Sequence, residues 1–293
     1  MKIAVTGGNG RFGRVVVRLL KNGGHDVLNI DQAASERHNS DVPFFAANMR
    51  DLDALTNALQ GHDGVVHLAA IPSPQSAPAP EVYANNTIGS YHVLFACAQL
   101  GIKKVCLASS INSIGGAYSR AARYDYFPVD EAHPTYNEDA YSLSKWVLEA
   151  QADSFARRYE DMTLSTLRFH GLVPTRYDGT PRMESPTMVN HLWAYTHIDD
   201  AAKACELCLQ ATWRGHERFF IVGPRTVVTV PSLELAARFY PQTKLNGDLS
   251  GDRSFYDCSK AKRLLGWEHR VETEFGPSPF PFGPGAPSAP RSR

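Results

Sequence analysis

Short apolar runs rich in β-branched residues alternate with longer amphipathic stretches along most of the chain. The apolar runs predict strands at Lys2–Thr6, Asp26–Ile30, Gly64–Leu68, Lys104–Ala108, Leu164–Phe169 and Phe219–Val222. The amphipathic stretches predict helices at Arg11–Asn22, Leu52–Leu59, Glu81–Leu100, Ala140–Arg158 and Asp199–Gln210, with short ones at Pro231–Phe239 and Ser259–Leu265. Because strands that alternate with helices form parallel sheets covered on both faces, an α/β fold with a doubly wound parallel sheet is expected.

The alternation weakens after residue 170 and returns only for a short stretch. We therefore expect a core over residues 1–170, to which residues 196–224 return, and a smaller C-terminal lobe built from 171–195 and 225–275. Residues 276–293 hold six prolines and three glycines and are predicted to be a disordered extension.

Composition limits the classes of partner and the location. The chain has 293 residues, and its 30 Lys+Arg balance its 30 Asp+Glu, so it carries no net positive field for nucleic acid or an anionic membrane. No run of about 18 apolar residues predicts a membrane span, and no secretory leader pattern precedes the first strand. The five cysteines are an odd number, which argues against a disulfide scaffold and favours the cytoplasm. Cys205 and Cys208 lack a second Cys/His pair, so they predict helix packing and no metal site.

The strongest local signal is a glycine-rich turn between the first strand and the first helix. Gly7, Gly10 and Gly13 have the spacing of a dinucleotide-binding turn. The first glycine permits the tight turn, the second lets the backbone approach a pyrophosphate, and the third lets the helix pack closely on the strand. Arg11 and Phe12 lie within this turn and are expected beside the cofactor.

The residue at the end of the second strand bears on which dinucleotide binds. Asp31 follows Gly13 by 18 residues, where an acid accepts hydrogen bonds from the ribose 2′-hydroxyl and repels a 2′-phosphate. NAD is therefore favoured over NADP. Arg11, Arg14 and Arg37 remain candidate phosphate contacts, which leaves NADP as the alternative.

A second constellation carries acid–base chemistry. Tyr141 and Lys145 are four residues apart at the start of a predicted helix and share one face. A cation beside a phenol lowers the phenol pKa and lets it exchange a proton with a substrate hydroxyl or carbonyl. Ser110 follows a strand, where its hydroxyl can bind the oxygen whose charge changes during hydride transfer.

Together these motifs resemble the extended short-chain dehydrogenase/reductase family, also called the NAD-dependent epimerase/dehydratase family, over roughly residues 1–267. Further similar segments are His67–Ala70, Asn86–Gly89, Pro128–Glu131 and Leu264–Trp267. The resemblance implies a Rossmann core with a substrate lobe, Tyr141 as acid/base, Lys145 on the nicotinamide ribose and Ser110 on the reacting oxygen. Its implied cofactor contacts also include Asn48, Met49, Ala69, Ala70 and Asn86. Asn48 stands where the family often has an Asp that meets adenine, and its amide oxygen can replace that carboxylate.

Within the family, the nearest resemblance is to uronate dehydrogenases. The shared features are the segment Ala108–Gly115 and the pair Arg182–Met183, in which the Arg is implied to hold a sugar carboxylate. Further candidate substrate contacts are Ser73, Asn112 and His170. The segment Pro72–Pro80 is rich in proline and apolar residues, which favours a less polar substrate.

These features predict an NAD-dependent oxidoreductase acting on a small substrate: a sugar acid, a lactol, or a secondary alcohol or ketone. One alternative is an NAD-retaining epimerase of nucleotide sugars. Such enzymes usually have an Arg at the position of Leu249, for which Arg253 is a substitute. Another alternative is a non-catalytic dinucleotide-binding protein. The family resemblance also implies a homodimer through the helices Glu81–Leu100 and Ala140–Arg158.

Overall fold

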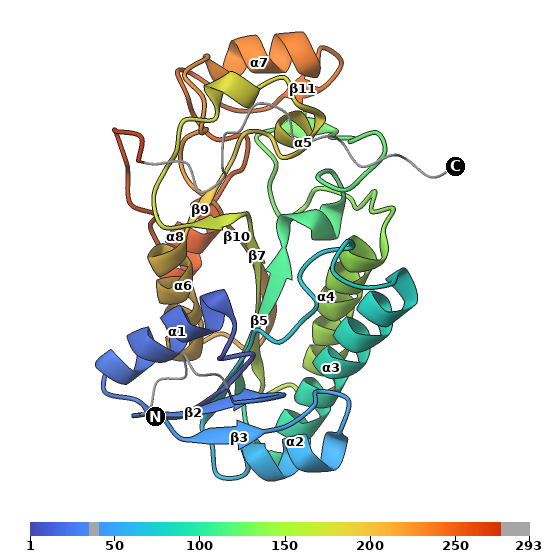
Figure 1. Ribbon diagram of the computed structural model, residues 1–293, viewed down its shortest axis with the longest axis vertical. Helices are drawn as coiled ribbons and strands as arrows, with labels where there is room; N and C mark the ends of the chain where they lie inside the picture. The colour runs from blue at the N-terminus through green and yellow to red at the C-terminus, as the bar shows by residue number, and fades with distance from the viewer. Residues whose placement is uncertain (35–40, 277–293) are drawn as a thin grey trace.

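A seven-stranded parallel sheet forms the centre of the computed structural model, which describes residues 1–34 and 41–276 (Figure 1). The strand order is β10-β7-β5-β4-β1-β2-β3. The strands are β1 Lys2–Thr6, β2 Asp26–Asp31, β3 Phe44–Ala46, β4 Gly64–His67, β5 Lys104–Ser110, β7 Thr163–Phe169 and β10 Gly215–Ile221. The order reverses next to β1, so the connections that follow β1 and β4 pass to opposite faces of the sheet. They leave a crevice at the carboxyl ends of these strands, where ligands bind in such sheets.

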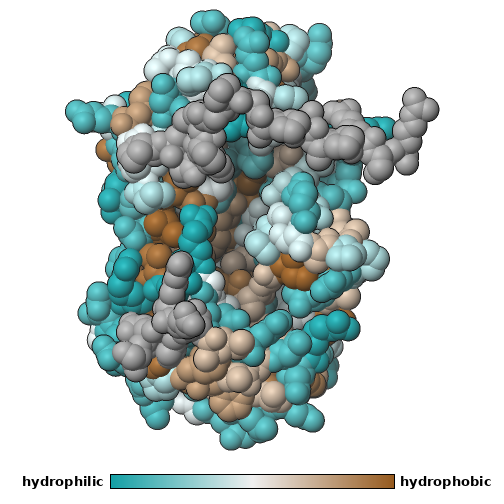
Figure 2. All heavy atoms as spheres, viewed as in Figure 1, coloured by the Kyte–Doolittle hydropathy of each residue, from teal (hydrophilic) through white to brown (hydrophobic). Residues whose placement is uncertain are grey.

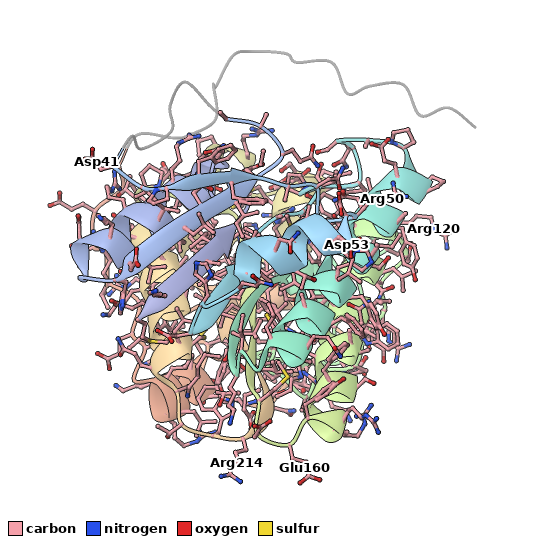
Figure 3. All side chains as sticks on the ribbon, turned by 90° about the horizontal axis from the view of Figure 1, so that it is seen from below. Asp41, Arg50, Asp53, Arg120, Glu160 and Arg214 are labelled. Atoms are coloured by element: carbon pink, nitrogen blue, oxygen red, sulfur yellow. The ribbon has the colours of Figure 1, made fainter. Side chains whose placement is uncertain are left out.

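Helices cover both faces of the sheet. On one face, α1 (Arg11–Asn22), α6 (Ile198–Gln210) and α8 (Ser259–Leu265) bury residues in one hydrophobic cluster with the strands. On the other face, α2 (Leu52–Leu59), α3 (Ala79–Leu100) and α4 (Ala140–Arg158) form a second cluster. Charged side chains such as Glu160 and Arg214 project from the turns before β7 and β10, at the amino ends of the strands (Figure 3).

A smaller lobe lies beyond the carboxyl ends of the strands (Figure 1). Its elements are the pairs β6 (Tyr126–Phe127) with β11 (Lys244–Leu245) and β8 (Leu172–Val173) with β9 (Thr196–His197), and the short helices η1 (Ile111–Ile114), η2 (Thr180–Arg182), α5 (Pro186–Asn190) and α7 (Ser232–Phe239). Its core is aromatic, with Trp193 between Phe239 and Phe255 at ring separations of 5.4 and 5.5 Å.

Buried Arg176 ties three distant segments of the lobe together. Its guanidinium donates to the Asp252 carboxylate at 2.6 Å, to the Thr226 carbonyl at 2.8 Å and to the Glu272 carbonyl at 3.2 Å. Its backbone amide donates to the Glu272 carboxylate at 2.6 Å. The lobe is thus held partly by one buried charge whose hydrogen bonds reach three of its segments.

The predicted fold class is confirmed, and α1, α2, α4 and α8 begin and end at the predicted residues. The last strand was predicted too short, because the first residues of β10 are polar and half-buried at the edge of the sheet. The edge strand β3 was not predicted at all, since three residues carry no alternation. The prediction of a disordered extension falls outside the described residues except at Gly276, whose amide donates to the Arg176 carbonyl at 2.7 Å.

Two further findings concern cysteines and membrane spans. Cys205 and Cys208 are buried in the core with Cys106, and the described cysteines are all free thiols. Over residues 1–34 and 41–276 no three His, Cys, Asp or Glu side chains gather as they would around a metal ion. In the same described residues, every helix is too short or too polar to cross a membrane.

Candidate active site

The glycine-rich turn joins β1 to α1 with no room for a side chain at Gly7 or Gly13. Gly7 has a φ of 73°, and a Cβ there would lie 2.6 Å from the Ala69 amide nitrogen. A Cβ on Gly13 would lie 2.1 Å from the Gly7 carbonyl oxygen. Gly10 is the N-cap of α1, and a Cβ there would meet only the Gly7 carbonyl oxygen, at 3.2 Å. The turn therefore requires glycine at its first and third positions.

The amino end of α1 is open to an anion. Gly10 provides no side-chain cap, and the first turn carries no acidic side chain, so its free amides fit a pyrophosphate. Arg11 is exposed at the start of this helix, and the Phe12 ring packs edge-on against Phe169 at 5.2 Å. The residues present thus fit the pyrophosphate of a dinucleotide.

Asp31 ends β2 beside the same turn. Its carboxylate accepts from the backbone amides of Asn9 at 3.0 Å and Gln32 at 2.8 Å, which leaves lone pairs for ribose hydroxyls. Asn48 is exposed, and its Oδ1 accepts from the Arg50 amide at 2.9 Å. Among the other proposed contacts in this region, Met49 is buried in the core, and Arg37 lies outside the described residues.

The strand end after β4 is fixed by Asn86. Its Oδ1 accepts from the Ile71 amide at 2.8 Å, and its Nδ2 donates to the Ile71 carbonyl and to the Ser144 hydroxyl at 3.1 Å. Ala69 and Ala70 lie half-buried in the segment so held. Asn86 was predicted as a cofactor contact, and here it orders the segment that passes Gly7.

Tyr141 lies in the first turn of α4, which Asp139 caps. The Asp139 carboxylate accepts from the amides of Tyr141 and Ser142, both at 2.9 Å. Burial raises the pKa of the Tyr141 phenol, and a hydrogen bond with Ser110 opposes that rise. Ser110 ends β5, and its hydroxyl accepts from the Asn112 amide at 3.1 Å. The structure therefore brings together the two hydroxyls that the sequence placed in the catalytic constellation.

Lys145 lies one turn after Tyr141 and is buried. Its ammonium donates to the Ala108 carbonyl at 2.7 Å and lies 5.7 Å from the centre of the Tyr141 ring. Burial lowers the Lys145 pKa to about 8, against the opposing charge of Glu149. Behind it, His67 accepts or donates a hydrogen bond with Thr6 at 2.7 Å, and burial followed by the Lys145 charge lowers the His67 pKa to about 3. The cation beside the phenol therefore faces a neutral imidazole.

A chain of rings leads from Tyr141 into the lobe. Tyr118 lies 5.9 Å from the Tyr141 ring and 6.3 Å from His191, which lies 5.2 Å from His170. The two residues after His191, Leu192 and Trp193, have φ values of 54° and 51°, a strained conformation that is often found at functional sites. Neither Tyr118 nor His191 was predicted as a contact, because each lies in a segment without periodicity.

His170 has no free ring nitrogen for a substrate. Its Nδ1 accepts from the Gly171 amide at 2.6 Å, and its Nε2 lies 3.1 Å from the His191 carbonyl, to which it must donate. Burial lowers the His170 pKa to about 3, in keeping with this neutral form. His170 thus offers ring faces and carbon edges rather than a hydrogen bond.

A cavity of about 200 Å³ opens beside these histidines in the lobe. Its lining includes Val173, Tyr177, Met188 and Ala194, with Arg182 as its single charged side chain among the described residues. In Figure 2 the surface is hollowed between the sheet and the lobe, with hydrophobic residues in its depth.

The remaining predicted substrate contacts occupy different places. Asn112 is buried beside Ser110, and its Oδ1 has no hydrogen-bond partner in the described residues. Ser73 lies in the loop after β4, where its hydroxyl pairs with that of Ser76 at 2.8 Å. Arg253 lines a different cavity, which shares no residue with the one at Arg182.

A dinucleotide turn joined to a buried Ser–Tyr–Lys constellation defines an NAD-dependent enzyme of the oxidoreductase type. The family model described as "NAD dependent epimerase/dehydratase family" matches residues 3–223, and the chain belongs to this family. NAD is therefore its coenzyme, which agrees with the acid at the end of β2.

Known relatives include both dehydrogenases and epimerases. An L-arabinose 1-dehydrogenase (NAD(P)(+)) of Haloferax volcanii is 36% identical over 165 residues, which is 54% of this chain and 62% of that protein. A UDP-glucose 4-epimerase of Thermotoga maritima, solved with UDP-glucose, is 25% identical, with a TM-score of 0.69 over 93% of this chain and 94% of the other. A mutated uronate dehydrogenase shares the fold, with 20% identity and a TM-score of 0.68 over 93% and 82% of the two chains.

Proposed function

We propose that this protein is an NAD-dependent dehydrogenase that moves hydride between nicotinamide and a hydroxyl or carbonyl carbon of a small substrate. The substrate classes are a sugar acid, a lactol, or a secondary alcohol or ketone. The observation that carries the proposal is the packing of Ser110, Tyr141 and Lys145 at the carboxyl end of β5, from which the rings of Tyr118 and His191 lead to a compact lobe cavity. The archaeal L-arabinose dehydrogenase relative supports it.

Each residue has a defined task in oxidation. Tyr141 takes the proton of the substrate hydroxyl, and Ser110 hydrogen-bonds the same oxygen as its charge changes. Lys145 stabilises the tyrosinate electrostatically and is expected to bind the nicotinamide ribose. NAD, when bound, supplies the hydride acceptor.

The lobe cavity favours a small substrate. Its lining contains Val173, Met188 and Ala194, and its volume of about 200 Å³ is small for a drug-sized ligand. Arg182 is exposed at this cavity and forms no ion pair with any described residue. We infer that it pairs with a substrate carboxylate, which would place a sugar acid or another compact acid here.

Nucleotide-sugar epimerisation is the second candidate, and family relatives support it. The local residues favour it less. Leu249, at the position of the usual diphosphate-binding Arg, is 1% exposed in the lobe core. Arg253, the substitute, is exposed and paired with Asp248 at 3.0 Å, away from the cavity at Arg182.

NADH formation should be measured with NAD and a panel of uronic acids, aldoses and hydrophobic secondary alcohols. We expect activity on at least one class and a loss of about a thousandfold in Tyr141→Phe, because the acid/base group is removed. Arg182→Met should raise KM at least about tenfold for carboxylate substrates and leave neutral ones unchanged. Silence across the panel, with NAD retained through purification, would favour the epimerase.

We also propose a homodimer in the cytoplasm. Large apolar side chains remain exposed on α3 and α4, namely Tyr83 at 37%, Tyr91 at 46%, Leu143 at 37% and Trp146 at 42%. The reduced cysteines fit a cytoplasmic location. Trp146→Glu should give monomers in sedimentation experiments, whereas Leu233→Glu, at an equally exposed site on α7, should not. Monomeric wild-type protein would contradict the dimer.

A further inference from the structure

A buried carboxylate follows the catalytic residues along α4. Glu149 lies one turn after Lys145 and two turns after Tyr141, so the three side chains share one face of the helix. Glu149 is 2% exposed, and its Oε1 accepts from the Ser109 hydroxyl at 2.6 Å. The catalytic roles described above make no use of this carboxylate.

Three consecutive residues of β5 meet this face of α4. The Ala108 carbonyl accepts from Lys145 at 2.7 Å, the Ser109 hydroxyl donates to Glu149, and Ser110 hydrogen-bonds with Tyr141. Three turns of the helix thus contact three neighbouring residues of the strand, although not in the same order. A slip of Glu149 against Ser109 would therefore also shift α4 against Ala108 and Ser110, the strand residues that meet Lys145 and Tyr141.

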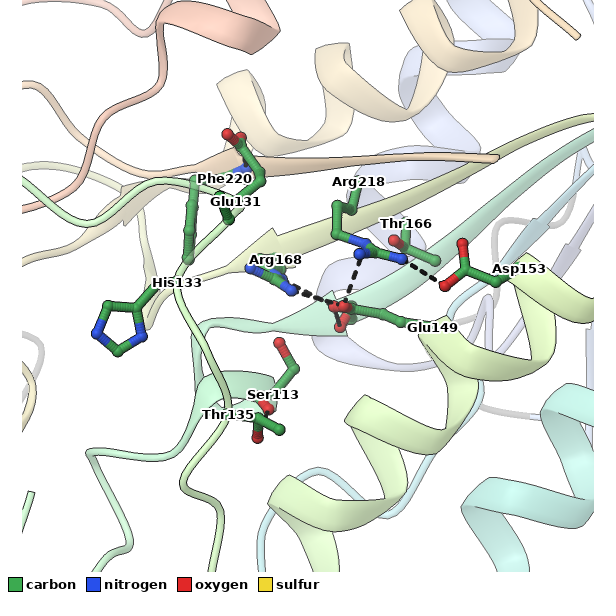
Figure 4. A network of polar contacts seen from close by, with 12 residues as sticks. Ser113, Glu131, His133, Thr135, Glu149, Asp153, Thr166, Arg168, Arg218 and Phe220 are labelled. Carbon is green, nitrogen blue, oxygen red and sulfur yellow. Dashed lines mark hydrogen bonds and ion pairs between the residues drawn. The ribbon is translucent and has the colours of Figure 1, made fainter. Parts of the chain in front are cut away.

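Glu149 is in turn fixed from the neighbouring strands (Figure 4). Arg168 on β7 binds it through two nitrogens, at 2.9 Å and 2.7 Å, and is itself 3% exposed. Arg218 on β10 lies 3.7 Å from the same carboxylate and pairs with Asp153 at 2.6 Å. Because Arg168 binds both carboxylate oxygens of Glu149, the carboxylate is held in one orientation, in which Oε1 points toward Ser109.

We propose that Glu149 is a positioning residue: it sets the register between α4 and the end of β5 and places a buried carboxylate one helical turn from Lys145. This inference rests on the roles proposed above for Lys145 and Tyr141. The part of its test that measures kcat also requires the proposed dehydrogenase function.

The charge of Glu149 acts on the Lys145 pKa, which packing of an uncharged side chain would not do. Lys145 faces Tyr141 and Glu149 from α4 and neutral His67 from β4, and among these Glu149 is the anion that raises the Lys145 pKa. Arg168 holds the pKa of the buried Glu149 below its usual range, against the effect of burial, so Glu149 stays charged. Removing its charge should lower the Lys145 pKa below about 8, so that the proton leaves at lower pH.

The first test uses coenzyme binding and needs no substrate. NADH dissociation constants, measured by fluorescence across a pH series, should show an inflection near the Lys145 pKa. In Glu149→Gln we expect this inflection to move to lower pH by about one unit. Asp153→Asn is the control, because Asp153 lies one turn further along α4 and pairs with Arg218 and His216 rather than with β5. An unmoved inflection in folded Glu149→Gln, or an equal shift in Asp153→Asn, would overturn the proposal.

Ser109→Ala tests the register without removing a charge. We expect it to keep the pH inflection and to lower kcat about tenfold, with KM for NAD unchanged. Should Glu149→Gln fail to fold, Ser109→Ala decides alone, and an unchanged kcat would reject the positioning role. If Glu149→Gln moves the inflection as expected but the wild-type protein oxidises no substrate, then the proposed dehydrogenase function fails while the role of Glu149 stands.

Discussion

The sheet and the lobe are stabilised in different ways. The strands around β1 pair through their backbones and are buried between two apolar clusters. The lobe has short strands of two residues, an aromatic core and one buried arginine that bonds three segments. The sheet half can therefore present a fixed coenzyme site, while the stability of the lobe depends on a few specific polar contacts.

Arg176→Met is the substitution that should destabilise the lobe most strongly while sparing the sheet. Loss of this guanidinium leaves Asp252 and two carbonyl groups without their donor, so the free energy of unfolding should fall by about 3 kcal/mol. Hydrogen exchange should rise in the lobe before it rises in the sheet.

Arg225→Met is the matched control for this change. Arg225 is 37% exposed and lies 3.6 Å from the same Asp252 carboxylate, so its loss should cost within about 0.5 kcal/mol. Equal losses of stability in the two variants would contradict the special role of the buried arginine.

Gly13→Ala should damage the sheet half instead. Its Cβ would lie 2.1 Å from the Gly7 oxygen, so the turn must open, at a cost of about 1–3 kcal/mol and with a marked rise in the NAD dissociation constant. Isothermal titration and thermal unfolding measure the two effects. At Gly171 no atom would lie within 4 Å of an added Cβ, so Gly171→Ala should leave both quantities unchanged. Normal NAD binding by Gly13→Ala would mean that the turn does not hold the coenzyme.

The pH dependence of stability sharpens the comparison further. Burial lowers the pKa of His67 in the sheet to about 3 and that of His191 in the lobe to about 4, while unfolded histidines titrate near 6.5. The unfolded chain therefore binds more protons below about pH 6.5, and stability should fall as the pH drops from there toward 4. Each such histidine contributes at most about 1.4 kcal/mol per pH unit.

His170→Gln isolates the contribution of His170 to the loss of stability at acidic pH. A glutamine amide can still accept from Gly171 and donate to the His191 carbonyl, but it does not titrate. The stability of this variant should decline less steeply from pH 6.5 to 4 than that of wild-type protein, as followed by urea unfolding at each pH. An identical slope would show that His170 is solvated rather than buried.

The contrast between the regular sheet half and the irregular lobe explains which features could be predicted from the sequence. Helices such as α1 and α4 were predicted to the residue, because their period and their caps, Gly10 and Asp139, are local signals. Tyr141, Lys145 and Ser110 meet as expected, since parallel strands and their following helices bring chemistry to one edge. Tyr118 and His191 were not assigned as contacts, because a ring-to-ring contact between irregular segments leaves no periodic trace.

The span of the Arg176 contacts bears on the order in which the chain folds during synthesis. Arg176 is separated by 76 residues from Asp252 and by 96 from Glu272. Most strands of the sheet are complete before residue 170, so these strands and the face covered by α2, α3 and α4 can assemble while the later segments are still being translated. The lobe closes last, and a chain stalled before residue 252 would expose its aromatic core to the chaperones and proteases that examine nascent proteins.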